Sequence, residues 1–243
     1  MPEITIRDVF TVFGFWTSRP VDVSLEALCA ILDKQAVARA ATLATVGIFV
    51  DSRRGNDLTW QAAQDDARLV PIGVVDPRGG TRCIEELAER AEQGFQIFAL
   101  FPETQGWSLD HACLAEALRL AAKAGAVVMV EAGQQGAPTL VGRLAERSDA
   151  RVILSRVGYH NLGETLMVMK SSARIFVETH MLASTDALEM AVDEVGSDRL
   201  LFGSCAPLRY FSSAYLRVRF ADVAEAERAA VLGGNFARLL EQS

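Results

Sequence analysis

Residues 126–154 read AVVMVEAGQQGAPTLVGRLAERSDARVIL, and this stretch decides the fold class. It contains two short apolar runs, Ala126–Val130 and Arg151–Leu154, and between them a segment of helical periodicity from Pro138 to Glu146. Apolar runs of this length, with no two-residue hairpin turn between them, are typical of parallel strands that are buried on both faces. The stretch therefore predicts a strand–helix–strand unit with parallel strands.

The same unit repeats along the whole chain. Helical segments lie between the apolar runs, for example Leu25–Arg39, for which Ser24 is a suitable N-cap. Eight such units in 243 residues predict the α/β class and a single (β/α)8 TIM barrel with parallel strands and short loops. The eight apolar runs are Ile4–Phe10, Ala44–Val50, Leu69–Val75, Gln96–Phe101, Ala126–Val130, Arg151–Leu154, Arg174–Val177 and Leu200–Phe202.

No linker, charge block or low-complexity stretch divides the chain, so we expect one domain over residues 1–243. It ends in an amphipathic helical segment, residues 221–241, which Gly233 and Gly234 are expected to break into two pieces. The alternative is a doubly wound open sheet, which often carries a glycine-rich loop after its first strand. Here the first run is followed by FGFW at residues 13–16 instead of GxGxxG, which favours the barrel.

The composition is that of an ordinary globular protein. Hydrophobic residues make up 50% of the chain and charged residues 23%, which excludes collagen-like, disordered and disulfide-scaffold classes. The net charge of −7 and the lack of a basic patch argue against nucleic-acid binding. No run approaches the ~20 apolar residues of a membrane span, and the first residues do not resemble a signal peptide. The four cysteines are widely spaced without a CxxC pair. We therefore expect a cytoplasmic protein that binds neither nucleic acid nor membrane.

Four segments of the chain follow the order of a known pattern. DVFTVFG at residues 8–14 lies where that pattern has Asp-x-His-x-His-x-Gly, and LLFGSCAP at residues 200–207 matches its Leu-Leu-Phe-Gly-Ser-Asp-x-Pro. FPETQGWSLD at residues 101–110 is similar to its loop after the fourth strand, and residues 227–240 are similar to its closing helix. Together these segments resemble the amidohydrolase superfamily, in particular the "amidohydrolase 2" metal-dependent hydrolases and decarboxylases. The resemblance extends over nearly the whole chain.

The resemblance implies a zinc or another divalent ion held by the His-x-His pair, a histidine after strand five or six, and an aspartate after strand eight. In this chain the His-x-His positions hold Phe10 and Val12, neither of which has a lone pair to donate. The positions after strands five and six hold Glu131 and Arg156, and Cys205 replaces the aspartate. A catalytic metal needs about three protein ligands and an open position for water. We therefore expect no metal cofactor and an inactive inherited hydrolytic mechanism.

Glu131, Arg156 and Cys205 are the candidate catalytic residues of this altered site. Glu131 and Arg156 follow adjacent strands, so we expect a charge-assisted pair, which also offsets the cost of burying an arginine. Cys205 is either a nucleophile activated by a nearby imidazole or cation, or a small residue where an aspartate is no longer needed. Asp8 lacks metal-binding neighbours and is expected to hold the first loop through hydrogen bonds.

The loops at the barrel mouth carry the candidate binding residues, because function lies at the carboxyl ends of barrel strands. The aromatic candidates either contact a ligand or pack beneath the loops. The two histidines could join Glu131 and Cys205 in a mixed metal site, or make only local hydrogen bonds. Arg209 could recognise a carboxylate or pair on the surface. The candidate binding residues are Trp16, Phe101, Glu103, Tyr159, His160 and His180.

Two classes of function remain open. The leading hypothesis is a non-catalytic pseudoenzyme that binds a small molecule at the mouth, or acts as a subunit of a paralogous amidohydrolase or of a homo-oligomer. The alternative is a hydrolase or decarboxylase of a small carboxylic or aromatic substrate. It would use a relocated metal, or a metal-free site built from Arg156, Glu131 and Cys205.

Overall fold

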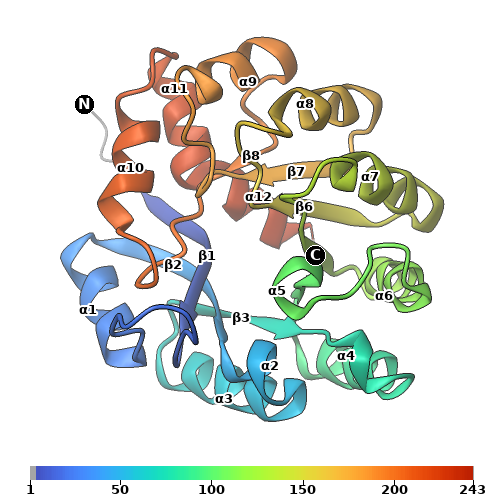
Figure 1. The fold of residues 1–243 in the computed structure, drawn as a ribbon. Coiled ribbons are helices and arrows are strands. Elements are labelled where there is room, and N and C mark those ends of the chain that lie inside the picture. The colour runs from blue at the N-terminus through green and yellow to red at the C-terminus, as the bar shows by residue number, and fades with distance from the viewer. Residues whose placement is uncertain (1–3, 243) are drawn as a thin grey trace.

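Eight parallel strands form a nearly closed barrel with helices around it in the computed structural model, which describes residues 4–242 (Figure 1). Strands that are consecutive in sequence pair in parallel from the first to the eighth, which confirms the predicted barrel. Residues 1–3 and Ser243, which the predicted domain includes, lie outside the described residues. The strands are β1 (Ile6–Phe13), β2 (Val37–Ala44), β3 (Leu69–Val74), β4 (Ile97–Leu100), β5 (Val127–Glu131), β6 (Arg151–Ser155), β7 (Ile175–Glu178) and β8 (Leu200–Leu201).

The strands are buried on both faces, as their continuous apolar runs predict. In β5, Val127 and Met129 belong to a cluster that also contains interior residues of β3 and β4. Val128 and Val130 belong to a second cluster, which includes the inner faces of the surrounding helices. Alternation along a strand sends successive side chains to opposite faces, so one run supplies both the barrel interior and the layer under the helices.

Backbone hydrogen bonds join the last strand region to the first. The Val9 amide donates to the Phe202 carbonyl at 2.8 Å, and the Cys205 amide donates to the Phe10 carbonyl at 2.8 Å. Asp8 adds a side-chain link, because its Oδ1 accepts from the amides of Phe10 and Ser204, each at 3.0 Å. Asp8 lies inside β1 and therefore joins this strand to the segment after β8, instead of holding the first loop as predicted.

The helices cover the outside of the barrel in the expected alternation. Within residues 4–242 no helix is long and apolar enough to cross a membrane. The helices are α1 (Leu25–Lys34), α2 (Val46–Phe49), α3 (Ser52–Asp65), the 3-10 turn η1 (Pro77–Gly79), α4 (Arg82–Gln93), α5 (Pro102–Gln105), α6 (Ala112–Lys123), α7 (Ala137–Ser148), α8 (Leu162–Ser171), α9 (Ala187–Val195), α10 (Phe211–Arg219), α11 (Glu225–Ala229), the π-helical turn η2 (Ala230–Gly234) and α12 (Asn235–Glu241).

The second strand lies earlier in the chain than the sequence predicts. The predicted helix Leu25–Arg39 ends at Lys34, because Ala36 adopts a left-handed φ of 49° and turns the chain. The strand then occupies Val37–Ala44, while most of the predicted strand Ala44–Val50 forms the short helix α2. The apolar character of that run reflects burial of a helical turn instead of a strand, and the true strand is rich in alanine, which gives little strand signal.

The closing helical segment is not divided at its glycines. α11, η2 and α12 follow one another without a break, and Gly233 and Gly234 lie inside the π-helical turn. A Cβ on Gly233 would lie 2.2 Å from the Thr5 carbonyl oxygen, so this glycine allows the helix to approach the chain just before β1. The prediction of two pieces was therefore wrong, because close packing and not helix termination explains the glycine.

Candidate functional site

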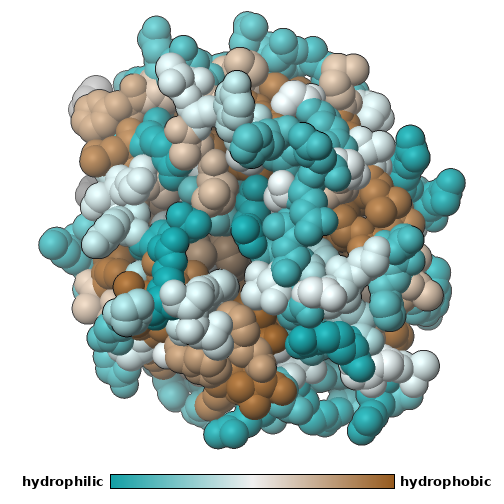
Figure 2. All heavy atoms as spheres, in the orientation of Figure 1, coloured by the Kyte–Doolittle hydropathy of each residue, from teal (hydrophilic) through white to brown (hydrophobic). Residues whose placement is uncertain are grey.

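A cavity of about 380 Å³ opens at the carboxyl ends of the strands. Figure 2 shows this face hollowed near its centre, with hydrophilic groups around a more apolar floor. Side chains from the carboxyl ends of β5 and β6, and from the segments that follow β1, β2, β4, β6, β7 and β8, line it. We call it the mouth cavity, and its lining residues are Phe10, Trp16, Thr17, Ser18, Arg19, Phe49, Phe101, Thr104, Glu131, Ser155, Arg156, His180, Cys205, Leu208 and Arg209.

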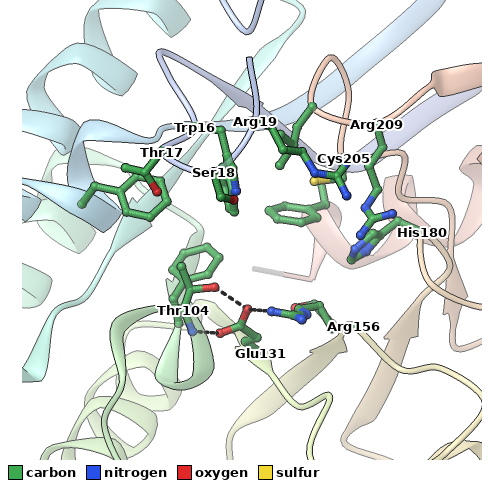
Figure 3. A pocket seen from close by; sticks show the side chains of 15 residues that line it. Trp16, Thr17, Ser18, Arg19, Thr104, Glu131, Arg156, His180, Cys205 and Arg209 are labelled. Carbon is green, nitrogen blue, oxygen red and sulfur yellow. Dashed lines mark hydrogen bonds and ion pairs between the residues drawn. The ribbon is translucent and has the colours of Figure 1, made fainter. Parts of the chain in front are cut away.

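Glu131 and Arg156 form the ion pair that the sequence predicts. Arg156 Nη1 lies 2.6 Å from Glu131 Oε1 (Figure 3). The Glu131 carboxylate also accepts from the Thr104 amide and from the Thr104 hydroxyl, each at 2.7 Å. Glu131 is 2% exposed, whereas the Arg156 side chain is 42% exposed. The carboxylate is thus fully hydrogen-bonded and fixed, while the guanidinium reaches into the opening of the cavity.

A second carboxylate lies close to Arg156. Glu103 Oε2 is 3.6 Å from Arg156 Nη1, and Glu103 Oε1 accepts from the Gln134 amide at 2.8 Å. Burial lowers the pKa of Arg156, but the hydrogen bond to Glu131 and the charges of Glu131 and Glu103 raise it by more. The guanidinium therefore stays charged, and two acidic side chains already match that charge.

Glu178 and His180 form a buried pair that sequence reasoning did not assign. Glu178 ends β7 and is fully buried, and its Oε1 lies 2.5 Å from His180 Nδ1. The same carboxylate accepts from the amides of Arg156 at 3.1 Å and His180 at 2.8 Å. Burial raises the pKa of Glu178, yet the charge of His180 and these hydrogen bonds lower it below its usual value. Glu178 is therefore ionised and orients the imidazole at the cavity wall.

Gly203 makes room for this pair. A Cβ on Gly203 would lie 2.6 Å from Glu178 Oε2, which is closer than a side-chain carbon can approach. The glycine of the LLFGS segment is thus required by the buried carboxylate. The presence of an acidic residue directly after the apolar run of β7 is the sequence signal that could have identified Glu178.

Cys205 lies in the wall of the mouth cavity but is 4% exposed. Burial raises the pKa of its thiol well above the usual range, and the charge of Glu178 adds to the effect. A thiol in this environment stays protonated near neutral pH, and a nucleophilic cysteine acts as the thiolate. The environment thus favours the interpretation of Cys205 as a small neutral residue over that of a nucleophile.

Arg19 and Arg209 also line the mouth cavity. Figure 3 shows both side chains near His180, on the opposite side of the cavity from Thr104 and Glu131. Within residues 4–242 neither guanidinium makes an ion pair with an acidic side chain or a hydrogen bond. Arg209 thus lies at the cavity, as its interpretation as a carboxylate-binding residue requires. Arg19 is an additional cation at the cavity, which the sequence analysis did not single out.

The remaining candidates separate into two places. Trp16, Phe101 and His180 line the mouth cavity. Glu103, Tyr159 and His160 line a neighbouring depression of about 640 Å³, to which Arg156 also contributes. Tyr159 is 78% exposed and meets the His160 ring at a centroid distance of 5.6 Å. His160 therefore does not share the mouth cavity with Glu131 and Cys205.

The residues at the mouth do not fit a divalent ion at the position that the resemblance implies. Phe10 lines the cavity with a carbon ring, and Val12 is fully buried. The oxygens of Glu131 accept from protein donors, and Nδ1 of His180 faces Glu178. Over residues 4–242 no group of three or more His, Cys, Asp or Glu side chains could hold a metal ion. The charged side chains at this position are therefore suited to hydrogen bonds and ion pairs, and not to metal coordination.

Asp8 lies beneath this wall as a fully buried carboxyl group. Its Oδ2 has no hydrogen-bond partner among the described residues. Burial raises the pKa of Asp8 to about 7, against the lowering effect of its hydrogen bonds with Ser204 and Phe10. The neutral carboxyl is therefore favoured at slightly acidic pH.

Several solved structures of similar fold are decarboxylases. The chain is 16% identical to 5-carboxyvanillate decarboxylase LigW from Sphingomonas paucimobilis, with a TM-score of 0.78 over 98% of this chain and 99% of that chain. It is 14% identical to a 2,6-dihydroxybenzoate decarboxylase from Rhizobium, with a TM-score of 0.76 over 98% and 99%. A dihydroxybenzoic acid decarboxylase from Polaromonas sp. JS666, solved with manganese and the inhibitor 2-nitroresorcinol, is 13% identical, with a TM-score of 0.78 over 98% and 97%.

These likenesses confirm the fold. A comparison with curated proteins gives no match. The sequence itself matches the model of one family, described as amidohydrolase, over residues 16–242. This match extends over the strands from β2 onward and over every loop that lines the mouth cavity. The chain belongs to the amidohydrolase family.

Proposed function

We propose that this protein binds a small aromatic carboxylate in the mouth cavity, with the carboxylate held by Arg19 and Arg209 and without a coordinated metal ion. The observation that carries the proposal is the pair of guanidinium groups that have no acidic partner among the described residues, in the wall of an aromatic cavity. In a chain of net charge −7, cations left unmatched beside a cavity indicate a site for an anion.

The charges around the cavity select where the carboxylate binds. Arg156 is already matched by Glu131 and Glu103, so that side of the cavity carries no surplus positive charge. Arg19 and Arg209 carry the surplus on the opposite side. Arginine presents a planar fork of donors that fits a carboxylate in two-point contact. The carboxylate therefore binds on the Arg19–Arg209 side, and the Thr104–Glu131 side suits a hydroxyl group of the ligand.

The rest of the lining suits a flat apolar ring. Phe10, Trp16, Phe49, Phe101 and Leu208 contribute apolar surface, and the Trp16 and Phe49 rings meet edge to face at 5.0 Å. A volume of about 380 Å³ is within the range of small-molecule sites. Offset or edge-on contact with these side chains stabilises an aromatic ring that is bound in such a cavity. The similar decarboxylase structures, whose names contain aromatic acids, support the same ligand class.

Isothermal titration with 2,6-dihydroxybenzoate and benzoate tests the proposal, with benzamide as the uncharged analogue. We expect Arg209→Gln to weaken binding of the acids at least about ten-fold, about 1.4 kcal/mol, and benzamide to bind poorly to both proteins. Arg143→Gln, an exposed change on α7, is the matched control and should bind as the unmodified protein does. Equal affinity of Arg209→Gln and Arg143→Gln, or equal affinity for benzoate and benzamide, would refute the proposal.

A second candidate function, decarboxylation of the bound acid, is favoured by the Glu178–His180 pair. Glu178 Oε1 lies 2.5 Å from Nδ1 of His180, which lines the cavity, and an imidazole oriented by a carboxylate can act as a general acid. Transfer of a proton from the imidazolium to the ring carbon, with loss of the carbon–carboxylate bond, yields the arene, carbon dioxide and neutral His180. Release of carbon dioxide that stops in His180→Gln while the acid still binds would support this function. The predicted role as a non-catalytic subunit, the paralogous partner and the homo-oligomer stay predictions.

A further inference from the structure

A second cavity, of about 460 Å³, lies beside the mouth cavity between the segment after β8 and the helix α10. We call it the α10 cavity. None of its lining residues is acidic, whereas three are arginines. Its lining residues are Arg19, Val21, His180, Met181, Ala183, Ser204, Pro207, Leu208, Arg209, Tyr210, Ser213, Ala214 and Arg217.

Arg217 is held in place in this cavity by the backbone. Its Nη2 donates to the His180 carbonyl at 2.9 Å, and its Nε donates to the Ser213 carbonyl at 3.1 Å. Among the described residues, Nη1 donates no hydrogen bond. Because two of its three nitrogens are engaged, the guanidinium is oriented before any ligand arrives, which reduces the entropy lost on binding.

The positive charge of this cavity is not matched within the part of the chain that the structure describes. Arg217, like Arg19 and Arg209, makes no ion pair with an acidic side chain of residues 4–242. Burial lowers the pKa of Arg217; the charge of Glu178 opposes this effect, and the charge of Arg209 adds a smaller lowering. Burial thus disfavours the charged guanidinium, and an anion bound next to it would stabilise the charge.

We propose that the α10 cavity binds a dianionic oxyanion of the phosphate-monoester class. Three arginines exceed the charge of one carboxylate, and they match a dianion with three exposed oxygens. Ser213 and Tyr210 line the same cavity, and their hydroxyl groups can donate to such oxygens. The volume exceeds that of a bare phosphate ion, so the ligand includes a small organic group next to the phosphate.

The two cavities share four lining residues, namely Arg19, His180, Leu208 and Arg209. An anion in the α10 cavity therefore competes for the two arginines that hold the carboxylate in the mouth cavity. This consequence rests on the proposed function. Coupling between two sites is reciprocal. The phosphate therefore lowers the affinity for the aromatic acid by the same factor by which the acid lowers the affinity for the phosphate.

Titration of the full chain with phenyl phosphate and inorganic phosphate at constant ionic strength tests the site, with phenol as the uncharged analogue. We expect saturable phenyl phosphate binding, at least about ten-fold weaker in Arg217→Gln and lost in Ser213→Glu, which places a carboxylate at the cavity wall. Ser213 is exposed, so this second variant folds even if Arg217→Gln does not. Arg217→Gln should bind benzoate as the unmodified protein does, because Arg217 does not line the mouth cavity. Ser213→Glu should weaken benzoate binding, because its carboxylate competes for the two shared arginines as a bound anion would.

The outcomes separate the two proposals. Phenyl phosphate binding that is unchanged in Ser213→Glu and Arg217→Gln, or that is absent from the unmodified protein, overturns the α10 site and leaves benzoate binding untouched. Loss of benzoate binding in Arg209→Gln with normal phosphate binding leaves the α10 site in place but removes the shared role of Arg209. The coupling is supported if phosphate lowers the affinity for benzoate in the unmodified protein but not in Ser213→Glu or Arg217→Gln.

Discussion

Glu131 and Arg156 lie 2.6 Å apart at the mouth of the barrel, yet only Glu131 is buried, at 2% exposure against 42% for the arginine side chain. The pair therefore differs from a fully buried ion pair, in which both charges lose their water. Its stability derives from the carboxylate, which accepts three hydrogen bonds from Thr104 and Arg156. The arginine, in contrast, keeps part of its hydration and faces the ligand cavity.

Glu131→Gln should lower the free energy of unfolding by about 1–2 kcal/mol, because the amide loses the charge-assisted bond and turns a donor toward donors. Urea denaturation measures the change. Glu116→Gln is the matched control, since Glu116 pairs with Arg119 at 2.5 Å on the exposed face of α6 and should change stability much less. Equal losses in the two variants would mean that Glu131 is not held as described.

Arg156→Gln should leave the affinity for benzoate within about three-fold of that of the unmodified protein, because Glu131 and Glu103 already match the charge of Arg156. Arg209→Gln, which removes an unmatched charge, should have the larger effect. Calorimetric titration of the two variants under identical salt conditions compares them directly. A greater loss in Arg156→Gln would place the carboxylate on the other side of the cavity.

Asp8 should make stability depend on pH. Burial raises its pKa from 3.8 to about 7 in the folded protein, so its carboxyl contributes stability below pH 4 that is lost as pH rises through 7. Asp8→Asn keeps an oxygen for the amides of Phe10 and Ser204 but cannot ionise. The variant should therefore gain stability over the unmodified protein between pH 4 and 7, on the order of 4 kcal/mol. If the difference in unfolding free energy between Asp8→Asn and the unmodified protein does not change with pH, the raised pKa of the buried Asp8 carboxyl is wrong.

Gly203→Ala should destabilise the fold by about 2 kcal/mol or more, because the new Cβ would lie 2.6 Å from Glu178 Oε2. Displacement of Glu178 should also disturb His180, which NMR of the imidazole detects. Gly163→Ala is the control, since a Cβ on Gly163 in α8 meets nothing within 4 Å and alanine favours the helix. A loss of stability in the control alone would contradict the packing described here.

The sequence predicts most of this fold because its apolar runs report burial on both strand faces. The runs at β5 and β6 were placed within a residue or two of the strands. The second strand was missed because its alanines carry little strand signal, and α10 was not predicted. The apolar run Ala44–Val50 resembled a strand because most of it forms the short helix α2, whose residues are largely buried.

The site was only partly predictable, for a different reason. Glu131 and Arg156 could be paired because they follow adjacent strands, which any parallel barrel brings together. Arg19 and Arg209 come from loops that are 190 residues apart in numbering, and only barrel closure between β1 and the segment after β8 makes them neighbours of one cavity. No local pattern marks such a pair.

Titration of benzoate into chelator-treated protein, repeated with added manganese, tests the central claim most directly. Because arginine side chains and not metal ligands are proposed to hold the carboxylate, the affinity should be the same with and without manganese, and manganese alone should not raise the melting temperature. Benzoate binding that requires manganese, together with a melting shift produced by the ion, would contradict the account.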